Sequence, residues 1–290
     1  MAPRIAQCSL VSVANSKLIS LVAALVFTGA ATLSDVPKRV VSINLCTDQL
    51  ALMLASPGQL VSVSKLAHDP TSSVMHEAAS SLPTNNSGAE EAFLMQPDLV
   101  LAGTFNSAAT VRMLDTLGVR VELFEPANAL ADVPKVIAQM GRALGQEARA
   151  AEIITAYESR LSTLSETPAH RPRAALTYVN SYTTGDKTLA GDILRAAGFD
   201  NVATEAGMDY GGTLNLEQLV MLKPDVVIRG RNYPGQARAE DNLTHPVLKS
   251  MLTTNHGDGL SDRDWICGTP HVLDALEEIR TIRHRLEARS

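Results

Sequence analysis

The sequence predicts an α/β protein with two Rossmann-like α/β lobes, joined by a long helical connector, and a ligand cleft between the lobes. Three observations predict this class. Short β-branched strands alternate with amphipathic helices, an order that favours right-handed crossovers and mostly parallel sheets. More than thirty residues of helix formers interrupt this alternation near the middle of the chain. One segment that precedes this interruption occurs again, in similar form, after it.

In the first lobe, apolar β-branched runs predict strands at 39–44, 59–64, 97–102 and 120–125. A helix capped near Thr47 is expected after the first of these strands. A second helix, over 111–118, is closed by Gly118.

The connector runs from Ala131 to about Glu166 and is interrupted only at Gly141 and Gly145, so it is either one long helix or two in succession. Prolines then end it. The second lobe is expected to contain strands at 174–180 and 225–230 and helices at 189–198, 215–222 and 270–288. The predicted boundaries are a signal peptide over 1–31, a first lobe over 38–128, a connecting helix over 129–167 and a second lobe over 168–290.

The repeated segment reads "GAEEAFLMQPDLVLAG" at 88–103 and "NLEQLVMLKPDVVIRG" at 215–230. Both copies keep a glutamate, a Pro-Asp pair that begins seven positions later, and a closing glycine. Proline cannot continue a helix, and aspartate suits the turn that follows. The two copies therefore predict equivalent helix-to-strand units, one in each lobe. The alternative is that the two segments are alike by chance, since a helix followed by Pro-Asp and a strand recurs in many α/β folds.

The N-terminus predicts export from the cytoplasm. Arg4 and Lys17 precede the apolar run "LISLVAALVFTGAA", and small residues at Gly29 and Ala31 suit a signal peptidase. The run is short for a membrane span, although a membrane anchor is the alternative. We expect residues 1–31 to be cleaved and the mature protein to reside in the periplasm.

Composition argues against a nucleic-acid partner, because the net charge is −6, basic residues are scattered and aromatic residues are few. Cys46 and Cys267 remain after signal removal, in a compartment where disulfides persist. Sequence alone does not decide whether they pair or stay separate thiols.

The paired units, the opening "RVVSINLCTDQL" and the helical connector together resemble periplasmic substrate-binding proteins of iron-chelate and cobalamin ABC importers. The resemblance runs from about Arg39 to the C-terminus. It implies two lobes joined by a rigid helix, a small hinge motion, and a monomer that delivers a ferric siderophore, haem or cobalamin to a permease with its ATPase. The chelate would be cargo, so no cofactor and no catalytic residue are expected.

In that family a surface glutamate on each lobe docks into arginine pockets of the permease, and Glu90 and Glu217 match those positions. Two like charges a fixed distance apart specify orientation and hasten encounter. The alternative is that each is a first-turn carboxylate favoured by the helix dipole. Glu90 also fits a capping box with Ser87, and Glu91 could share either role.

The ligand cleft is expected just past the strand ends, where ligands collect in parallel α/β sheets. A large chelate needs aromatic walls and a few polar groups, and arginines would suit an anionic ferric chelate. Ordinary loop packing is the alternative for each residue. The candidate ligand contacts are Asn44, Cys46, Thr47, His68, Asp69, Thr104, Phe105, Tyr178, Asn180, Tyr182, Asp209, Tyr210, Arg229, Arg231, Asn232, Tyr233 and Trp265.

Three alternatives concern the ligand or the function. A free zinc or manganese carrier needs converging His and carboxylate ligands, whereas the seven histidines are dispersed. Haem would have His68, Tyr210 or Tyr233 as conceivable axial ligands. A secreted hydrolase could use Cys46 with His68, but the common catalytic motifs are missing from the sequence, which favours a protein that is not an enzyme.

Overall fold

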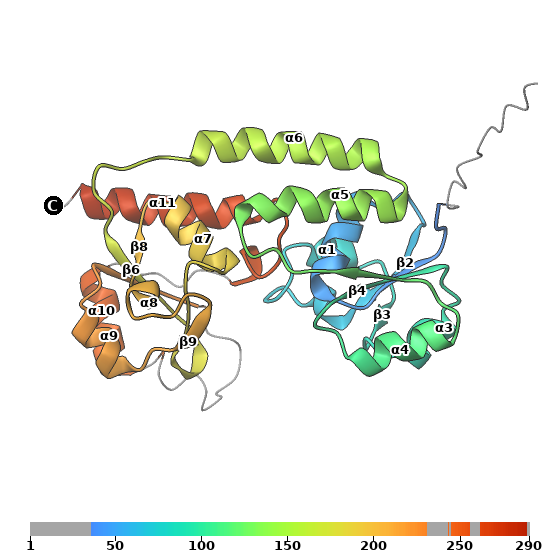
Figure 1. Ribbon diagram of the computed structural model, residues 1–290, viewed down its shortest axis with the longest axis horizontal. Coiled ribbons are helices and arrows are strands. Elements are labelled where there is room, and N and C mark those ends of the chain that lie inside the picture. Colours follow the sequence, from blue (N-terminus) through green and yellow to red (C-terminus); the bar gives the residue numbers. More distant parts are fainter. Residues whose placement is uncertain (1–35, 231–242, 244, 256–261, 289–290) are drawn as a thin grey trace, which may run out of the picture. The chain divides into compact units, whose positions relative to one another are not determined.

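The computed structural model describes residues 36–230, 243, 245–255 and 262–288 (Figure 1). The predicted signal peptide over 1–31 lies outside these residues, as do Arg231, Asn232 and Tyr233. The chain from Asp35 onward forms one compact unit. Within the described part, no helix has both the length and the apolar character that crossing a membrane requires.

The first lobe contains a five-stranded sheet in the order β3-β2-β1-β4-β5, in which all pairs are parallel. Its helices are α1 (Leu45–Leu54), α2 (His76–Ala79), α3 (Ala89–Leu94) and α4 (Ala108–Thr116), with the 3-10 turn η1 (Lys65–His68). Its strands are β1 (Val40–Ser42), β2 (Leu60–Ser64), β3 (Thr84–Asn85), β4 (Leu99–Gly103) and β5 (Val121–Phe124).

The second lobe contains a parallel three-stranded sheet, β10-β6-β8, and a separate antiparallel pair, β7-β9. Its strands are β6 (Arg173–Thr177), β7 (Tyr182–Thr184), β8 (Asp200–Asn201), β9 (Gly211–Thr213) and β10 (Val226–Arg229). Its helices are α7 (Leu189–Ala196), α8 (Val202–Glu205), α9 (Leu216–Leu222), α10 (Pro246–Asn255) and α11 (Val272–Glu287), with the 3-10 turns η3 (Val179–Ser181) and η5 (Asp262–Asp264). The two parallel sheets confirm the predicted class.

The connector consists of the 3-10 turn η2 (Leu130–Asp132) and two helices, α5 (Val133–Leu144) and α6 (Glu147–Leu164). The first helix ends at Gly145, which has a φ of 67° and so adopts the left-handed conformation that favours glycine. The chain reverses there, and α6 packs against both α5 and α11 (Figure 1). Of the two forms that the sequence allowed, the structure has two helices in succession.

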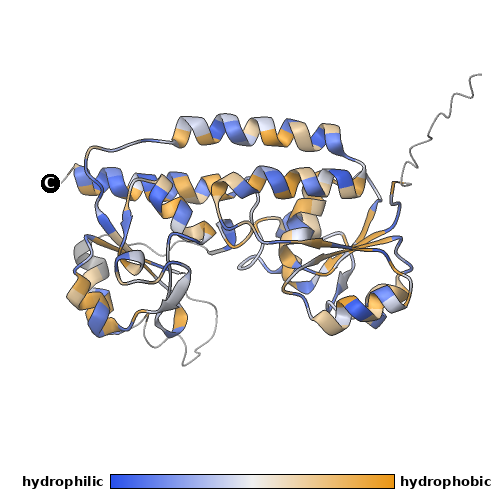
Figure 2. Cartoon of the chain, in the orientation of Figure 1, coloured by the Kyte–Doolittle hydropathy of each residue, from blue (hydrophilic) through white to orange (hydrophobic). Residues whose placement is uncertain are grey.

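One apolar core extends through both lobes. It includes one face of each parallel sheet together with α1, α5, α7 and α11, for example Leu101, Ile137, Leu176 and Leu276. Two smaller cores lie on the opposite sheet faces, one beneath α3 and α4 and the other beneath α9 and α10. Strand β4 and the first three residues of β10 are accordingly apolar and buried (Figure 2). The shared core joins the lobes through apolar packing.

The repeated segment forms the same frame in both lobes. In the first, the backbone N–H groups of Lys38 and Arg39 donate to the Asp98 carboxylate at 2.8 and 2.9 Å, and the Arg39 guanidinium donates to the carbonyls of Met95 and Gln96. The aspartate thereby holds the start of the first strand, and the arginine satisfies carbonyls at the end of α3.

The second lobe repeats these contacts at the matching positions. The backbone N–H of Arg173 donates to Asp225 at 2.7 Å, and its guanidinium donates to the carbonyls of Leu222 and Lys223. The strand register matches as well, with Val40 opposite Leu99 in one sheet and Ala174 opposite Val226 in the other. The Pro-Asp repeat is therefore a structural repeat.

Several short elements differ from the expectation. The helix expected to be capped near Thr47 is capped by Asn44, three residues earlier, because the Asn44 side chain accepts from the first helical N–H groups. Strands β3 and β8 contain two residues each, too few to produce a periodic pattern.

Candidate ligand-binding site

The candidate site lies at the carboxyl ends of β1 and β4, where the strand order of the first sheet changes direction. After β1 the chain passes through α1 to β2 on one side, and after β4 it passes through α4 to β5 on the other. Such a switch point leaves a crevice between the two outgoing loops. Asn106 joins the loops here, because its amide donates to the Ile43 carbonyl at 3.0 Å and accepts from the Gly103 N–H at 2.7 Å.

Asn44 occupies the centre of this crevice. Its side-chain oxygen accepts from the N–H groups of Cys46 and Thr47 at 3.0 and 3.4 Å, which starts α1. A Cβ at Gly103 would lie 3.0 Å from the Asn44 amide nitrogen, so glycine leaves room for that amide. No described residue accepts a hydrogen bond from the Asn44 amide nitrogen, which leaves it available as a donor to a ligand.

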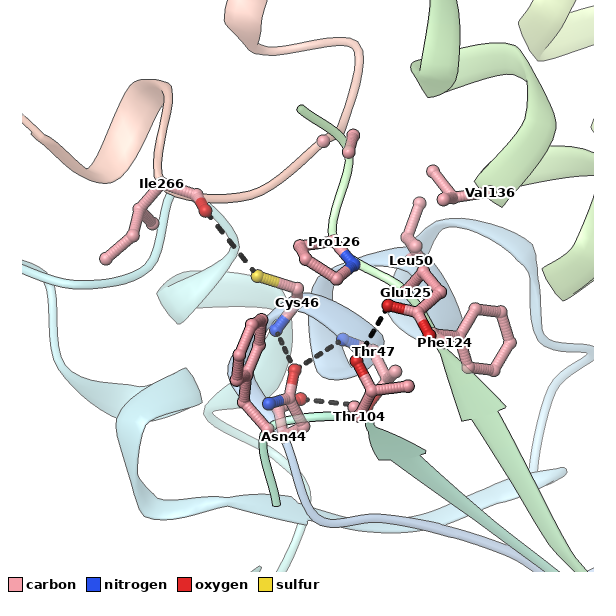
Figure 3. Close-up of a pocket in the computed structure, with 14 residues that line it drawn as sticks. Asn44, Cys46, Thr47, Leu50, Thr104, Phe124, Glu125, Pro126, Val136 and Ile266 are labelled. Atoms are coloured by element: carbon pink, nitrogen blue, oxygen red, sulfur yellow. Dashed lines mark hydrogen bonds between the residues drawn. The ribbon is translucent and has the colours of Figure 1, made fainter. Parts of the chain in front are cut away.

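A pocket of about 200 Å³ surrounds Asn44 (Figure 3). Its wall is mostly apolar, with a few polar groups. The Thr104 hydroxyl donates to the Glu125 carboxylate at 3.0 Å, which orients that carboxylate. Phe105 is 87% exposed, so its ring is free to contact a ligand. The lining residues are Asn44, Cys46, Thr47, Leu50, Gly103, Thr104, Phe105, Phe124, Glu125, Pro126, Ala127, Val136, Ile266 and Gly268.

The loop before α11 contributes Ile266 and Gly268 to the pocket, although the rest of the lining precedes α6 in the chain. A disulfide between Cys46 and Cys267, with Cα atoms 5.1 Å apart, ties this loop to α1. The backbone of Gly268 approaches so closely that a Cβ there would lie 2.4 Å from that of Ala127. The question that the sequence left open is answered: the two cysteines are paired, and they join the two lobes at the pocket.

A buried carboxyl group lies on the opposite side of α1. Asp48 is fully buried, and the backbone and hydroxyl of Ser64 both donate to it. Burial raises the pKa of Asp48 to about 7, and hydrogen bonds from Ser42 and Ser64 oppose this effect only in part. Asp48 ties α1 to the end of β2 and so steadies the helix that carries Asn44 and Cys46.

His68 and Asp69 lie beyond the pocket lining and make local contacts. His68 Nε2 is 2.9 Å from the Ala79 carbonyl oxygen. Asp69 accepts from Thr71 and Ser72, and the hydrogen bonds from the Ser72 hydroxyl and the Thr71 N–H lower the pKa of this carboxyl group. Both residues therefore hold the turn that follows β2.

Five of the second-lobe candidates lie in two short segments, 178–182 and 209–210. The rings of Tyr178 and Tyr182 are 6.1 Å apart, and Asn180 between them has a φ of 56°. Tyr210 is 67% exposed; the Lys187 ammonium lies 5.4 Å from its ring centre and pairs with Asp209 at 2.7 Å.

The remaining second-lobe candidates lie at the sheet edge and in the core. Arg229 ends β10 and is half-buried. Trp265 is only 4% exposed and packs in the shared core, while its neighbour Ile266 faces the pocket.

Sequence reasoning missed several lining residues. Glu125 and Pro126 directly follow the strand at 120–125, so the strand-end rule used for Thr104 would have found them. Leu50 lies one turn after Cys46 on α1. Val136, Ile266 and Gly268 reach the pocket only through packing between distant segments, and no local pattern indicates them.

The glutamates of the repeat lie on exposed positions of α3 and α9. Glu91, not Glu90, turns back to the helix start, where it accepts from the Asn86 N–H at 2.7 Å. The matching Gln218 makes a capping box with Asn215. The expected capping box between Glu90 and Ser87 is therefore not formed. Glu90 and Glu217 have no hydrogen-bond or ion-pair partner among the residues that the structure describes.

Within the described part of the chain, no group of three or more His, Cys, Asp or Glu side chains is arranged to bind a metal ion.

The family model for periplasmic binding proteins matches residues 40–209. The chain therefore belongs to the periplasmic binding protein family.

The curated "Cobalamin-binding protein" of Halobacterium salinarum is 30% identical over 236 residues, which cover 79% of this chain. The match spans 64% of that relative's own length. Two solved structures have the same two-lobe fold. One is the periplasmic heme-binding protein RhuT from Roseiflexus sp. RS-1, with a TM-score of 0.73 and 20% identity; the match covers 86% of this chain and 98% of that chain. The other is the periplasmic vitamin B12 binding protein BtuF of Vibrio cholerae, with a TM-score of 0.67 and 17% identity. This match covers 87% of this chain and 98% of that chain.

Proposed function

We propose that this chain captures a metal chelate outside the cytoplasm and delivers it to an ABC permease with its ATPase. The observation that carries the proposal is the pocket at the switch point of the first sheet, which has a wall from the second lobe, in a member of the periplasmic binding protein family. The protein acts as a carrier and not as an enzyme. Cys46 is half of a disulfide, so it supplies no thiolate nucleophile in this state, which speaks against the hydrolase alternative.

Among the chelates, we favour a corrinoid of the cobalamin type over haem or a ferric siderophore. Glu125 is the one charged side chain among the described lining residues, and a carboxylate disfavours anionic chelates. The Asn44 amide and the Thr104 hydroxyl suit the amide side chains of a corrinoid, while Phe105 and Ile266 suit its apolar ring face. The relative from Halobacterium salinarum is named for cobalamin binding.

Isothermal titration calorimetry of the mature protein with cyanocobalamin, haemin and ferrichrome tests two claims: that the protein binds a metal chelate, and that this chelate is a corrinoid. We expect saturable binding of cyanocobalamin that weakens about tenfold in Phe105→Ala, because a stacking surface is lost. Met113→Ala, at a 42% exposed position of α4 that lies outside the crevice around Asn44, is the matched control. Binding of haemin or ferrichrome instead would reject the corrinoid, and binding of none of the three would reject the chelate carrier.

We further propose that Glu90 and Glu217 dock the permease. Their matching positions, exposure and lack of described partners support this role, since Glu91 and Gln218 do the local capping. The double variant Glu90→Gln/Glu217→Gln should retain ligand affinity and lose most transport in proteoliposomes that contain the permease and ATPase. Glu152→Gln/Glu158→Gln, on exposed positions of α6, is the control. If Glu90→Gln/Glu217→Gln supports full transport, the two glutamates do not dock the permease.

We also propose that residues 1–31 are a cleaved signal peptide and that the mature protein is a periplasmic monomer. Its lobes would cover 38–128 and 168–290, with the connector over 129–167. Arg4, Lys17 and the apolar run between them and Ala31 support export. N-terminal sequencing of the exported protein and its sedimentation mass test both statements. An uncleaved N-terminus or a stable dimer would contradict them.

A further inference from the structure

The outer faces of α3 and α9 expose apolar side chains at matching positions of the repeat. Phe93 and Leu94 are 42% and 78% exposed, and the matching Val220 and Met221 are 43% and 80% exposed. Each pair lies three and four positions after the glutamate of its helix, so it shares a helix face with Glu90 or Glu217. We call these two surfaces, Glu90 with Phe93 and Leu94, and Glu217 with Val220 and Met221, the paired faces.

Exposure of this degree is unusual among the large apolar side chains that the structure describes. The four most exposed are Phe105, Met221, Leu94 and Tyr210. Two of these are candidate ligand contacts, and the other two occupy one and the same position of the repeat. A single exposed leucine needs no explanation, but an exposed apolar residue beside an unpaired carboxylate, present twice, indicates an interaction surface.

The paired faces are also held in place. Ala92 and Leu219, between the glutamate and the apolar pair, are buried against their sheets. The end of each helix is fixed by an arginine, since Arg39 donates to the Met95 carbonyl at 2.8 Å and Arg173 to the Leu222 carbonyl at 2.6 Å. Each apolar pair is therefore presented by a short helix with anchored ends, which reduces the entropy lost on binding.

We propose that the apolar pairs Phe93/Leu94 and Val220/Met221 form the centres of the two contacts with the permease, and that Glu90 and Glu217 form their charged rims. This inference rests on the proposed docking function. The partner must then present two equivalent binding surfaces, which we call sockets, each with an apolar centre and basic residues at its edge. A permease made of two identical subunits presents one such surface on each subunit. An apolar centre with a polar rim is the usual anatomy of a specific protein interface.

Charge favours this partner over two other occupants. If a second copy of this chain covered a paired face with its own, carboxylates would oppose carboxylates, which costs free energy. An anionic lipid surface would repel the same carboxylates and a chain whose net charge is −6. A basic-edged protein socket complements both the glutamates and the apolar pairs.

The test uses surface plasmon resonance to measure how tightly the mature protein, loaded with cyanocobalamin, binds the cobalamin permease–ATPase complex of the same organism in lipid nanodiscs. Leu94→Gln and Met221→Gln should each weaken binding about tenfold, and the double variant about a hundredfold, because a buried side chain of this size is lost at each socket. Affinity for cyanocobalamin and the thermal unfolding temperature should not change, since both side chains are exposed. Leu123→Gln and Val247→Gln, at positions 42% and 40% exposed in the two lobes, are matched controls.

The outcomes separate this inference from the docking proposal. Binding of the double variant within twofold of the unmodified protein would overturn the inference, while Glu90→Gln/Glu217→Gln in the same assay reports on docking itself. Self-association in sedimentation that disappears in Leu94→Gln/Met221→Gln would assign the faces to a second copy instead. Binding to protein-free vesicles of anionic lipid that the same variant loses would assign them to the membrane. Either result overturns the permease assignment.

Discussion

The two lobes share a frame and differ in what they build on it. Arg39 with Asp98 and Arg173 with Asp225 make the same contacts at the start of each lobe. Five positions after each arginine, however, stand different residues. Asn44 starts the ten-residue helix α1 and faces the pocket, whereas Tyr178 leads into η3 and the antiparallel pair β7-β9. The repeat therefore specifies the scaffold of both lobes, and the loops beyond it distinguish them.

Because of this difference, the Pro-Asp repeat predicts the fold of both lobes but not the residues of the candidate pocket. The Pro-Asp unit acts at the amino ends of the strands, where Asp98 and Asp225 hold Arg39 and Arg173. The candidate pocket lies at the opposite, carboxyl ends of β1 and β4, where the two lobes have unrelated loops. Three experiments test this difference between the lobes, beginning with the disulfide that joins them.

The largest expected effect comes from removing the disulfide in Cys46→Ser/Cys267→Ser. The bridge closes a separation of 221 residues, so its loss should lower the free energy of unfolding by about 2–5 kcal/mol. Urea unfolding measures the change, and the unmodified protein with and without reductant is the control. If neither the variant nor reductant moves the midpoint, the shared core alone holds the lobes together.

Asp48→Asn tests a feature of α1 that the second lobe lacks. The raised pKa of Asp48, about 7 against 3.8 in the unfolded chain, means that its stabilising contribution is complete below pH 3.8 and is lost as the pH rises to about 7. Between pH 5 and pH 8, the free energy of unfolding of the unmodified protein should therefore fall by about 2–3 kcal/mol relative to that of the variant. Urea unfolding of both proteins at both pH values measures this difference.

Asp69→Asn is the control for this experiment, because its folded-state pKa shifts the other way. The pKa of Asp69 is lowered, so its contribution is present above the unfolded value and is lost only as the pH falls below it. This control should show no relative change between pH 5 and pH 8. A pH-independent difference for Asp48→Asn would mean that Asp48 is ionised in the folded protein.

The smallest expected effects compare Asp98→Ala with Asp225→Ala. Asp98 accepts two backbone N–H groups and Asp225 accepts one, so the first substitution should cost about 2 kcal/mol and the second about 1 kcal/mol. Chemical denaturation of the two variants measures both. Equal costs would show that one of the two N–H groups on Asp98 bonds equally well to water when the carboxylate is removed. The motif would then contribute the same free energy to both lobes.

The sequence by itself determined the class of the fold, the order of its main strands and helices, and the repeat. These features are local, because the period of apolar residues and the turn chemistry of Pro-Asp and glycine act over a few positions. The same reasoning located Asn44, Cys46, Thr47, Thr104 and Phe105, which follow strand ends and line the pocket.

Only the tertiary structure decided which distant segments meet. The pairing of Cys46 with Cys267, the approach of Ile266 and Gly268 to the pocket, and the burial of Trp265 depend on how the loop before α11 packs against the first lobe. The fold also assigned capping to Glu91 rather than Glu90, and it buried Asp48 against Ser64. Such contacts arise from long-range packing and desolvation, which no local pattern in a single sequence encodes.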